Sequence, residues 1–82
     1  MQKFESYKDR EKYNTRHGGP FDRGSADSYY HRPREPHYYV GDTAMSTRLE
    51  MVDMSEKEVA DYNAGYDWNE QFGDKKSWGL LS

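Results

Sequence analysis

The sequence predicts a small α+β domain in the order helix, two-stranded hairpin, helix, preceded by a mobile N-terminal arm. Three observations predict it: a long segment after Ser55 has helical start and stop signals that agree, two short runs before it favour strands, and a pair of glycines isolates the first helix. The chain of 82 residues has room for one domain at most.

Residues 1–17 are predicted to form a flexible or frayed arm, and residues 18–82 to form the domain. The arm carries Phe4 and Tyr13 among many charges. This pattern is typical of a frayed helix or of a disordered segment, and disorder is slightly favoured. Gly18-Gly19 then interrupts the chain before the first helix.

A first helix is predicted from Pro20 to Arg32. Proline is favoured in the first helical turn. Pro33 should end the helix, because the residue before a proline is pushed out of the α region. Gly24 weakens the prediction, since glycine lowers helix propensity. The stripe expected to face inward consists of Phe21, Ser25, Ser28 and Tyr29.

A hairpin is predicted from His37–Val40 and Arg48–Val52, which flank the small, polar linker 41–47. A two-stranded ribbon is only marginally stable by itself, so at least one helix must cover it. The side chains expected to alternate toward the covered face are Tyr38, Val40, Leu49 and Met51.

The second helix is predicted from Glu56 to Phe72. Ser55 and Glu58 fit a capping box, in which the serine hydroxyl accepts from the Glu58 amide and the Glu58 carboxylate reaches back. Tyr62 and Tyr66 follow helical spacing further on. This agreement between cap and periodicity makes the helix the most persistent element expected.

Gly65 lies inside this helix, where glycine costs roughly 1 kcal/mol relative to alanine. On the helical wheel it lies near Tyr62 and Phe72. A gap flanked by rings lets another backbone or ring approach closely. Gly65 is therefore predicted to serve close packing, with ligand contact as the alternative. Gly73 is placed as the C′ residue that follows the helix.

The apolar content is low, so a tyrosine-rich core is expected. Leu, Val and Phe number three each and Ile is absent, a composition typical of disorder. Against this, the chain has eight Tyr, three Phe and two Trp. Each buried ring removes ~150–250 Å² from water. Stability is expected at the low end of the usual range of about 5–15 kcal/mol.

No catalytic site, metal, cofactor or small-molecule substrate is expected. The chain has no cysteine, its seven glycines form no phosphate-binding loop, and no nucleophile elbow surrounds its serines. His31, His37 and Asp42 match no known ligand spacing. No apolar run approaches the ~18 residues of a membrane span, and no signal-peptide core is present. These observations predict a non-enzymatic protein that avoids membranes and stays inside the cell.

The stretch from Ser25 to Val40 holds the candidate binding residues. Tyr29 and Tyr38 are predicted to be largely buried. An exposed aromatic–basic patch is predicted from Tyr30, Arg32, Arg34, His37 and Tyr39. Rings and arginines beside a proline-stiffened turn lose little entropy on binding, which is typical of a protein-recognition surface.

Two alternatives to this interpretation stay open. Arginines could contact phosphate while the rings stack on unpaired bases, although the net charge of residues 16–40 is only +1. The rings could also simply form the core. Residues 41–74 carry a net charge of −7, so the chain is expected to have two faces with different partners.

Several of these motifs resemble those of a known family. Gly19–Tyr30 (GPFDRGSADSYY), Pro36-His37-Tyr38, Ala60–Tyr66 (ADYNAGY) and Gly73–Trp78 (GDKKSW) resemble short uncharacterised proteins encoded by tailed phages. The resemblance implies a phage protein in the host cytoplasm. The function expected is binding of a host or virion protein during host takeover.

A looser likeness is to ribosome modulation factor, a strongly basic family that binds ribosomal RNA. Tyr62–Tyr66 (YNAGY) is similar to its Trp-x-x-Gly-Trp helix, and Pro36-His37-Tyr38 to its Pro-Tyr turn. His31-Arg32 stands where that family has Gly-Arg. This likeness implies an RNA- or ribosome-associated factor as the alternative function.

Overall fold

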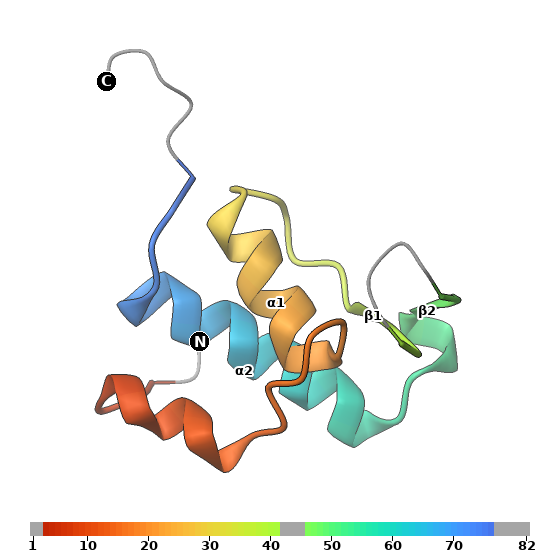
Figure 1. Ribbon diagram of the computed structural model, residues 1–82, viewed down its shortest axis with the longest axis horizontal. Helices are drawn as coiled ribbons and strands as arrows, with labels where there is room; N and C mark the ends of the chain where they lie inside the picture. The colour runs from red at the N-terminus through yellow and green to blue at the C-terminus, as the bar shows by residue number, and fades with distance from the viewer. Residues whose placement is uncertain (1–2, 42–45, 77–82) are drawn as a thin grey trace.

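The computed structural model describes residues 3–41 and 46–76. Its elements are η1 (Tyr7–Lys12), α1 (Pro20–Tyr29), β1 (His37–Tyr39), β2 (Arg48–Glu50), η2 (Met51–Asp53) and α2 (Glu56–Phe72), where η denotes a 3-10 helix. The α+β order helix, hairpin, helix is confirmed, and an N-terminal arm precedes it (Figure 1). Part of the predicted linker, 42–45, and the end of the last family motif, Ser77-Trp78, lie outside the described residues.

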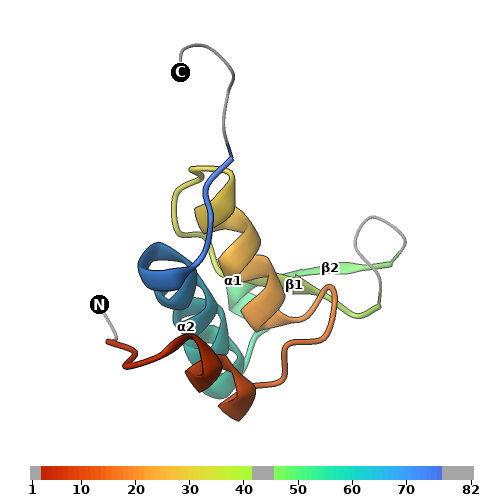
Figure 2. The ribbon, with the colours of Figure 1, turned by 60° about the vertical axis from the view of Figure 1, so that its left-hand side comes forward.

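The two α-helices lie side by side (Figure 2). Where they cross, a glycine on each helix lets the two backbones come into contact. A Cβ atom on Gly24 would lie 2.0 Å from the carbonyl oxygen of Tyr62. A Cβ atom on Gly65 would lie 2.1 Å from the carbonyl oxygen of Phe21. Gly65 therefore serves close helix packing, and Gly24, which weakened the sequence prediction of α1, is its counterpart on the other helix.

The predicted end of α1 is wrong, because the helix stops at Tyr29 and not at Arg32. His31 has a φ of 61°, in the left-handed region. Its amide donates to the Ser28 carbonyl at 3.1 Å, and the Arg32 amide donates to the Asp27 carbonyl at 2.8 Å. This pair of bonds is the Schellman arrangement. The stop therefore comes from the backbone around His31, ahead of Pro33.

The core is aromatic, but phenylalanine and tryptophan dominate it. Its central cluster is Phe4, Phe21, Ala64 and Trp68, with Tyr13 packed against it. Tyr62 is the one buried tyrosine among the described side chains. The expected tyrosine-rich core is therefore wrong. A buried tyrosine needs a partner for its hydroxyl, whereas a phenylalanine does not.

The inward stripe of α1 is rotated relative to the prediction. Its buried residues are Phe21, Gly24, Asp27 and Ser28, while Ser25 and Tyr29 are half-buried. The rotation follows from the crossing, since Gly24 must face α2 for the two backbones to approach.

The N-terminal arm packs against the domain through its rings. Phe4 is only 6% exposed, and its amide donates to Gln71 Oε1 at 2.9 Å. Tyr13 stacks on Phe21 with ring centroids 5.1 Å apart. The guanidinium of Arg10 lies 4.4 Å from the centre of the Trp68 ring. The arm thus completes the core, a role that the sequence did not reveal, and its mobility stays a prediction.

The hairpin is shorter than predicted and presents another face to the helices. The register pairs His37 with Glu50, Tyr38 with Leu49 and Tyr39 with Arg48. His37 is 5% exposed, whereas Val40 and Met51, both predicted to face inward, are 60% and 57% exposed. The predicted face is therefore wrong. His37 faces inward because the Glu35 carbonyl and the Asp27 carboxylate lie beside its ring there.

α2 has the predicted bounds, Glu56–Phe72. Both bonds of the capping box are present: Ser55 Oγ accepts from the Glu58 amide at 3.2 Å, and Glu58 Oε1 accepts from the Ser55 amide at 2.8 Å. Gly73 is not a left-handed C′ residue, because it caps the helix in an extended conformation. A Cβ atom there would lie 1.8 Å from Asn69 Oδ1, so a larger residue would have to displace the Asn69 side chain.

The glycine crossing can be tested by adding a methyl group at each side. Gly24→Ala and Gly65→Ala should each lower the free energy of unfolding by about 2 kcal/mol or more, because the new Cβ would meet backbone atoms that cannot move aside. Helix propensity alone predicts a gain of about 1 kcal/mol, so the sign is diagnostic. Urea unfolding followed by circular dichroism measures it.

Gly41→Ala is the matched control for both variants. Its Cβ would lie 3.5 Å from the nearest atom, which is ordinary van der Waals contact. This variant should stay within about 0.5 kcal/mol of the wild type. Stabilisation by Gly24→Ala or Gly65→Ala would show that the helices do not cross this closely in solution.

Candidate functional site

A buried polar cluster centred on Asp27 joins α1, α2 and the linker between α1 and β1. Asp27 is 4% exposed and accepts a short hydrogen bond from the Tyr62 hydroxyl. That hydroxyl in turn accepts from the Glu35 amide at 3.0 Å. Arg32 Nη1 lies 3.4 Å from one Asp27 oxygen, and His37 Nδ1 lies 3.7 Å from the other. Burial, together with the bond to Asp27, raises the pKa of Tyr62 far above its usual value. The hydroxyl therefore stays a neutral donor.

His37 is fixed in place by this cluster. Its Nδ1 lies 2.9 Å from the Glu35 carbonyl oxygen, which can only accept, so Nδ1 carries the proton in this bond. Its ring meets Tyr39 edge to face with centroids 5.9 Å apart, and the Tyr62 ring at 5.7 Å. The prediction that His37 is exposed is wrong, because the polar cluster supplies the partners that its ring needs for burial.

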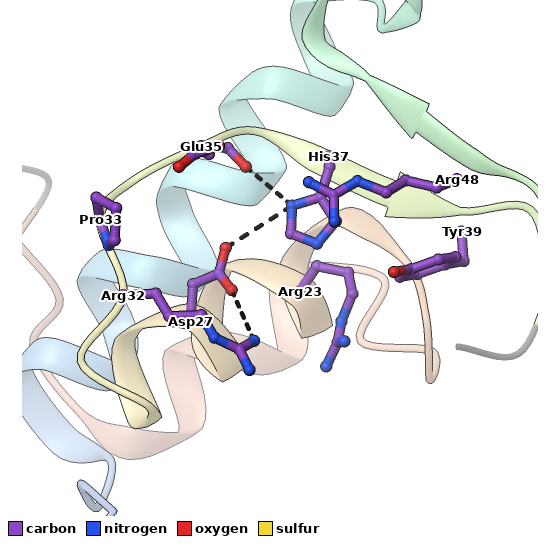
Figure 3. A pocket seen from close by; sticks show the side chains of 8 residues that line it. All are labelled: Arg23, Asp27, Arg32, Pro33, Glu35, His37, Tyr39 and Arg48. Atoms are coloured by element: carbon purple, nitrogen blue, oxygen red, sulfur yellow. Dashed lines mark hydrogen bonds and ion pairs between the residues drawn. The ribbon is translucent and has the colours of Figure 1, made fainter. Parts of the chain in front are cut away.

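A groove of about 600 Å³ opens beside the cluster. We call it the arginine groove, and its lining residues are Arg23, Asp27, Arg32, Pro33, Glu35, His37, Tyr39 and Arg48. Figure 3 shows that α1, the linker and both strands each contribute to it. Three of the five predicted patch residues, Arg32, His37 and Tyr39, therefore share one concave surface.

Carboxylates lie beside the arginines of the groove. Arg48 Nε donates to Glu50 Oε1 at 2.7 Å, and this bond, followed by one to the Tyr39 hydroxyl, raises the pKa of Arg48. Arg23 Nε lies 3.4 Å from Asp22 Oδ2, yet this buried nitrogen has no hydrogen-bond partner. The lining set holds three arginines, one aspartate and one glutamate, a formal charge of +1.

The other two predicted patch residues lie outside the groove. Tyr30 is 38% exposed, and the Arg32 guanidinium lies 4.8 Å from the centre of its ring. The Arg34 side chain instead binds α2, where Nη2 lies 2.6 Å from Asp67 Oδ1 and Nη1 donates to Asn63 Oδ1 at 3.2 Å. Its guanidinium also lies 4.3 Å from the centre of the Tyr66 ring. Arg34 therefore ties the linker to α2.

Tyr29 and Tyr38, predicted to be largely buried, are both half-buried. Tyr29 meets Tyr30 edge to face with centroids 4.9 Å apart. Tyr38 faces Glu58. The hydrogen bond from the Ser55 amide, followed by one from the Tyr38 hydroxyl, lowers the pKa of Glu58. The Tyr38 hydroxyl explains the incomplete burial of that residue, since it reaches a polar partner near the surface.

The sequence prediction missed Arg23, Asp27, Glu35 and Arg48. Two signals could have found them. Arg23 and Asp27 are four residues apart on one helix and therefore share a face. Arg48 lies opposite Tyr39 in the strand register. Glu35, in the irregular linker, has no such periodicity.

Comparisons with known families, proteins and structures give no guide to the site, which is therefore interpreted from its own residues. No family model, curated protein or solved structure matches the chain. Within residues 3–41 and 46–76, no group of three His, Asp or Glu side chains could hold a metal ion. Nor does any helix of this part have the length and apolar character to cross a membrane. The groove offers guanidinium donors beside aromatic rings, a combination suited to binding an acceptor-rich partner.

The role of Arg34 can be separated from that of Arg32 by alanine substitution. Arg34→Ala should lower the free energy of unfolding by about 2 kcal/mol, because Asp67 is 3% exposed and loses its guanidinium partner. Arg32→Ala should cost less than about 1 kcal/mol, because its side chain is 56% exposed and its ion pair with Asp27 is longer. If urea unfolding shows equally small losses of stability for the two variants, Arg34 would not be a structural tie and would again be a candidate binding residue.

The Asp27 cluster can be tested with Tyr62→Phe. The substitution preserves the ring but removes the hydroxyl that donates to Asp27 and accepts from the Glu35 amide. Stability should fall by about 1–3 kcal/mol, because both groups lose a bond in a buried setting. Tyr66→Phe is the control, since its hydroxyl donates to the Arg32 carbonyl at the surface. Thermal unfolding compares the two, and a larger loss from Tyr66→Phe would contradict the cluster.

Proposed function

We propose that this chain is a non-enzymatic binding protein that engages a protein partner through the arginine groove, with Tyr30 at its margin. The observation that carries the proposal is the convergence of Arg23, Arg32 and Arg48 with Tyr39 in one groove. The buried Nε of Arg23 has no hydrogen-bond partner. Because this nitrogen lies below the surface, the donors open to a partner are the guanidinium groups of Arg32 and Arg48, whose side chains are 56% and 42% exposed.

The electrostatics of the groove favour a protein over a nucleic acid. Its formal charge is only +1, and Asp22, Asp27 and Glu50 lie beside its arginines. A phosphate backbone calls for a clearly basic surface. Arginine and tyrosine, by contrast, are the residues that dominate binding energy at protein interfaces. The groove therefore suits an acidic or carbonyl-rich segment of a protein.

The walls of the groove are held in place before any partner arrives. The Tyr39 amide donates to the Gly18 carbonyl at 2.7 Å, and Arg16 Nη2 donates to the Tyr39 carbonyl at 2.8 Å. His37 is fixed by Glu35 and the Asp27 cluster. A surface that is already ordered loses less entropy on binding. This supports recognition by a rigid groove.

The resemblance to short tailed-phage proteins supports the setting of this function. We place the protein in the host cytoplasm, where its partner would be a host or virion protein met during host takeover. The alternative is an RNA- or ribosome-associated factor. One observation favours that alternative: Arg32 and Tyr30 form a stacked pair at the surface, which could hold an unpaired base.

Capture of partners from a bacterial host lysate tests the proposal. The tagged wild-type chain should retain a protein after nuclease treatment and at moderate salt, and the double variant Arg32→Ala/Arg48→Ala should lose it. Lys57→Ala is the control, because this cation pairs with Asp61 outside the groove. Loss of the partner on nuclease treatment, with steep salt dependence, would support the RNA alternative. Retention by the double variant would contradict both functions of this groove.

A further inference from the structure

A second surface, separate from the arginine groove, lies where η2 meets the start of α2. A groove of about 410 Å³ opens there. We call it the methionine groove, and its lining residues are Met51, Met54, Glu56, Val59, Ala60 and Asn63. It shares no lining residue with the arginine groove. Beside it on η2, Val52 is 89% exposed.

This groove forms because α2 presents Val59 and Ala60, flanked by two polar residues, on a second side of its N-terminal half. Glu56, Val59, Ala60 and Asn63 follow the spacing i, i+3, i+4, i+7, so they share one side of the helix. Another side, with Tyr62 and Gly65, meets α1. η2 then places Met51, which is 57% exposed, beside the first side. The result is a concave apolar strip that the chain's own core does not use.

The rim of the methionine groove is acidic. Residues 50–63 contain five acidic residues and one lysine, a formal charge of −4. Lys57 Nζ pairs with Asp61 at 2.9 Å, so the single cation is already engaged. Asp53 and Glu56 are exposed, and neither has an ion pair with another described residue. Glu56 lines the groove, and Asp53 lies on η2 between the lining residues Met51 and Met54, so both carboxylates belong to the elements that form it.

We propose that the methionine groove docks a basic amphipathic helix of a partner protein. An amphipathic helix lays side chains spaced i, i+3, i+4, i+7 into such a groove. Methionine side chains adapt to varied apolar surfaces, which makes them frequent at helix-binding sites. The free carboxylates select lysine and arginine on the polar side of the helix. A second copy of this chain fits less well, because a symmetric contact would bring acidic rim against acidic rim.

Fluorescence anisotropy with synthetic labelled peptides tests this proposal. The probe is an amphipathic helical peptide of leucine and lysine, ~18 residues long so that a helix can form. One comparison peptide has glutamate in place of lysine. Another has the composition of the probe in an order that leaves no apolar face. The wild-type chain should bind the first peptide and neither of the other two. Equal binding of either comparison peptide would overturn the proposal.

Matched variants locate the binding on the protein. Ala60→Lys should weaken binding about tenfold or more, because it fills the groove and repels the peptide. Ala60 is exposed on a helix, so the fold should tolerate lysine, and circular dichroism checks this. Val40→Lys is the control: it replaces a valine that is 60% exposed and lies outside the groove, and it should bind like the wild type. Equal weakening by both variants would overturn the site.

Two further measurements separate this proposal from its competitors. Asp53→Asn with Glu56→Gln should weaken binding and flatten its salt dependence, since the rim carboxylates would be gone. An unchanged salt dependence would overturn the selection for a basic helix. Sedimentation of the chain alone identifies the other occupant: self-association that Ala60→Lys abolishes would assign the groove to a second copy instead. Arg32→Ala/Arg48→Ala should bind the peptide normally, so this test stands independently of the arginine groove.

Discussion

The distance between two helix backbones governs most of this structure. Gly24 and Gly65 let α1 and α2 approach until a Cβ atom on either would meet a carbonyl oxygen of the other helix. That approach buries Phe21 and Tyr62 completely. With three Leu, three Val and no Ile, the chain has few branched aliphatic side chains for a wider interface. Close backbone packing with a few large rings replaces them.

The candidate binding site follows from the same crossing. Because Tyr62 lies at the crossing, its hydroxyl reaches Asp27 on α1 and the Glu35 amide in the linker. Asp27 then lies beside Arg32 and His37. A buried polar group of this kind must be satisfied, and these contacts satisfy it. The linker and β1 are thereby fixed against α1, and the arginine groove opens between them.

The charge division along the chain becomes a division in space. The arginine groove draws on α1, the linker and the hairpin, whereas the methionine groove draws on η2 and the acidic start of α2. The two share no lining residue. If both proposed sites bind proteins, the groove with three arginines and the groove with exposed carboxylates would favour partners of opposite charge.

The sequence by itself determined the bounds of α2, the start of α1 and the presence of a hairpin between them, because caps, prolines and periodicity act over a few neighbouring residues. It also indicated Gly65 as a close contact. A local turn at His31 ended α1. The tertiary structure decided the burial of His37, the attachment of Arg34 to α2 and the packing of Phe4. Each of these depends on a partner far along the chain. A polar or aromatic side chain is buried only where the fold supplies a partner for it. The local spacing of residues does not identify that partner.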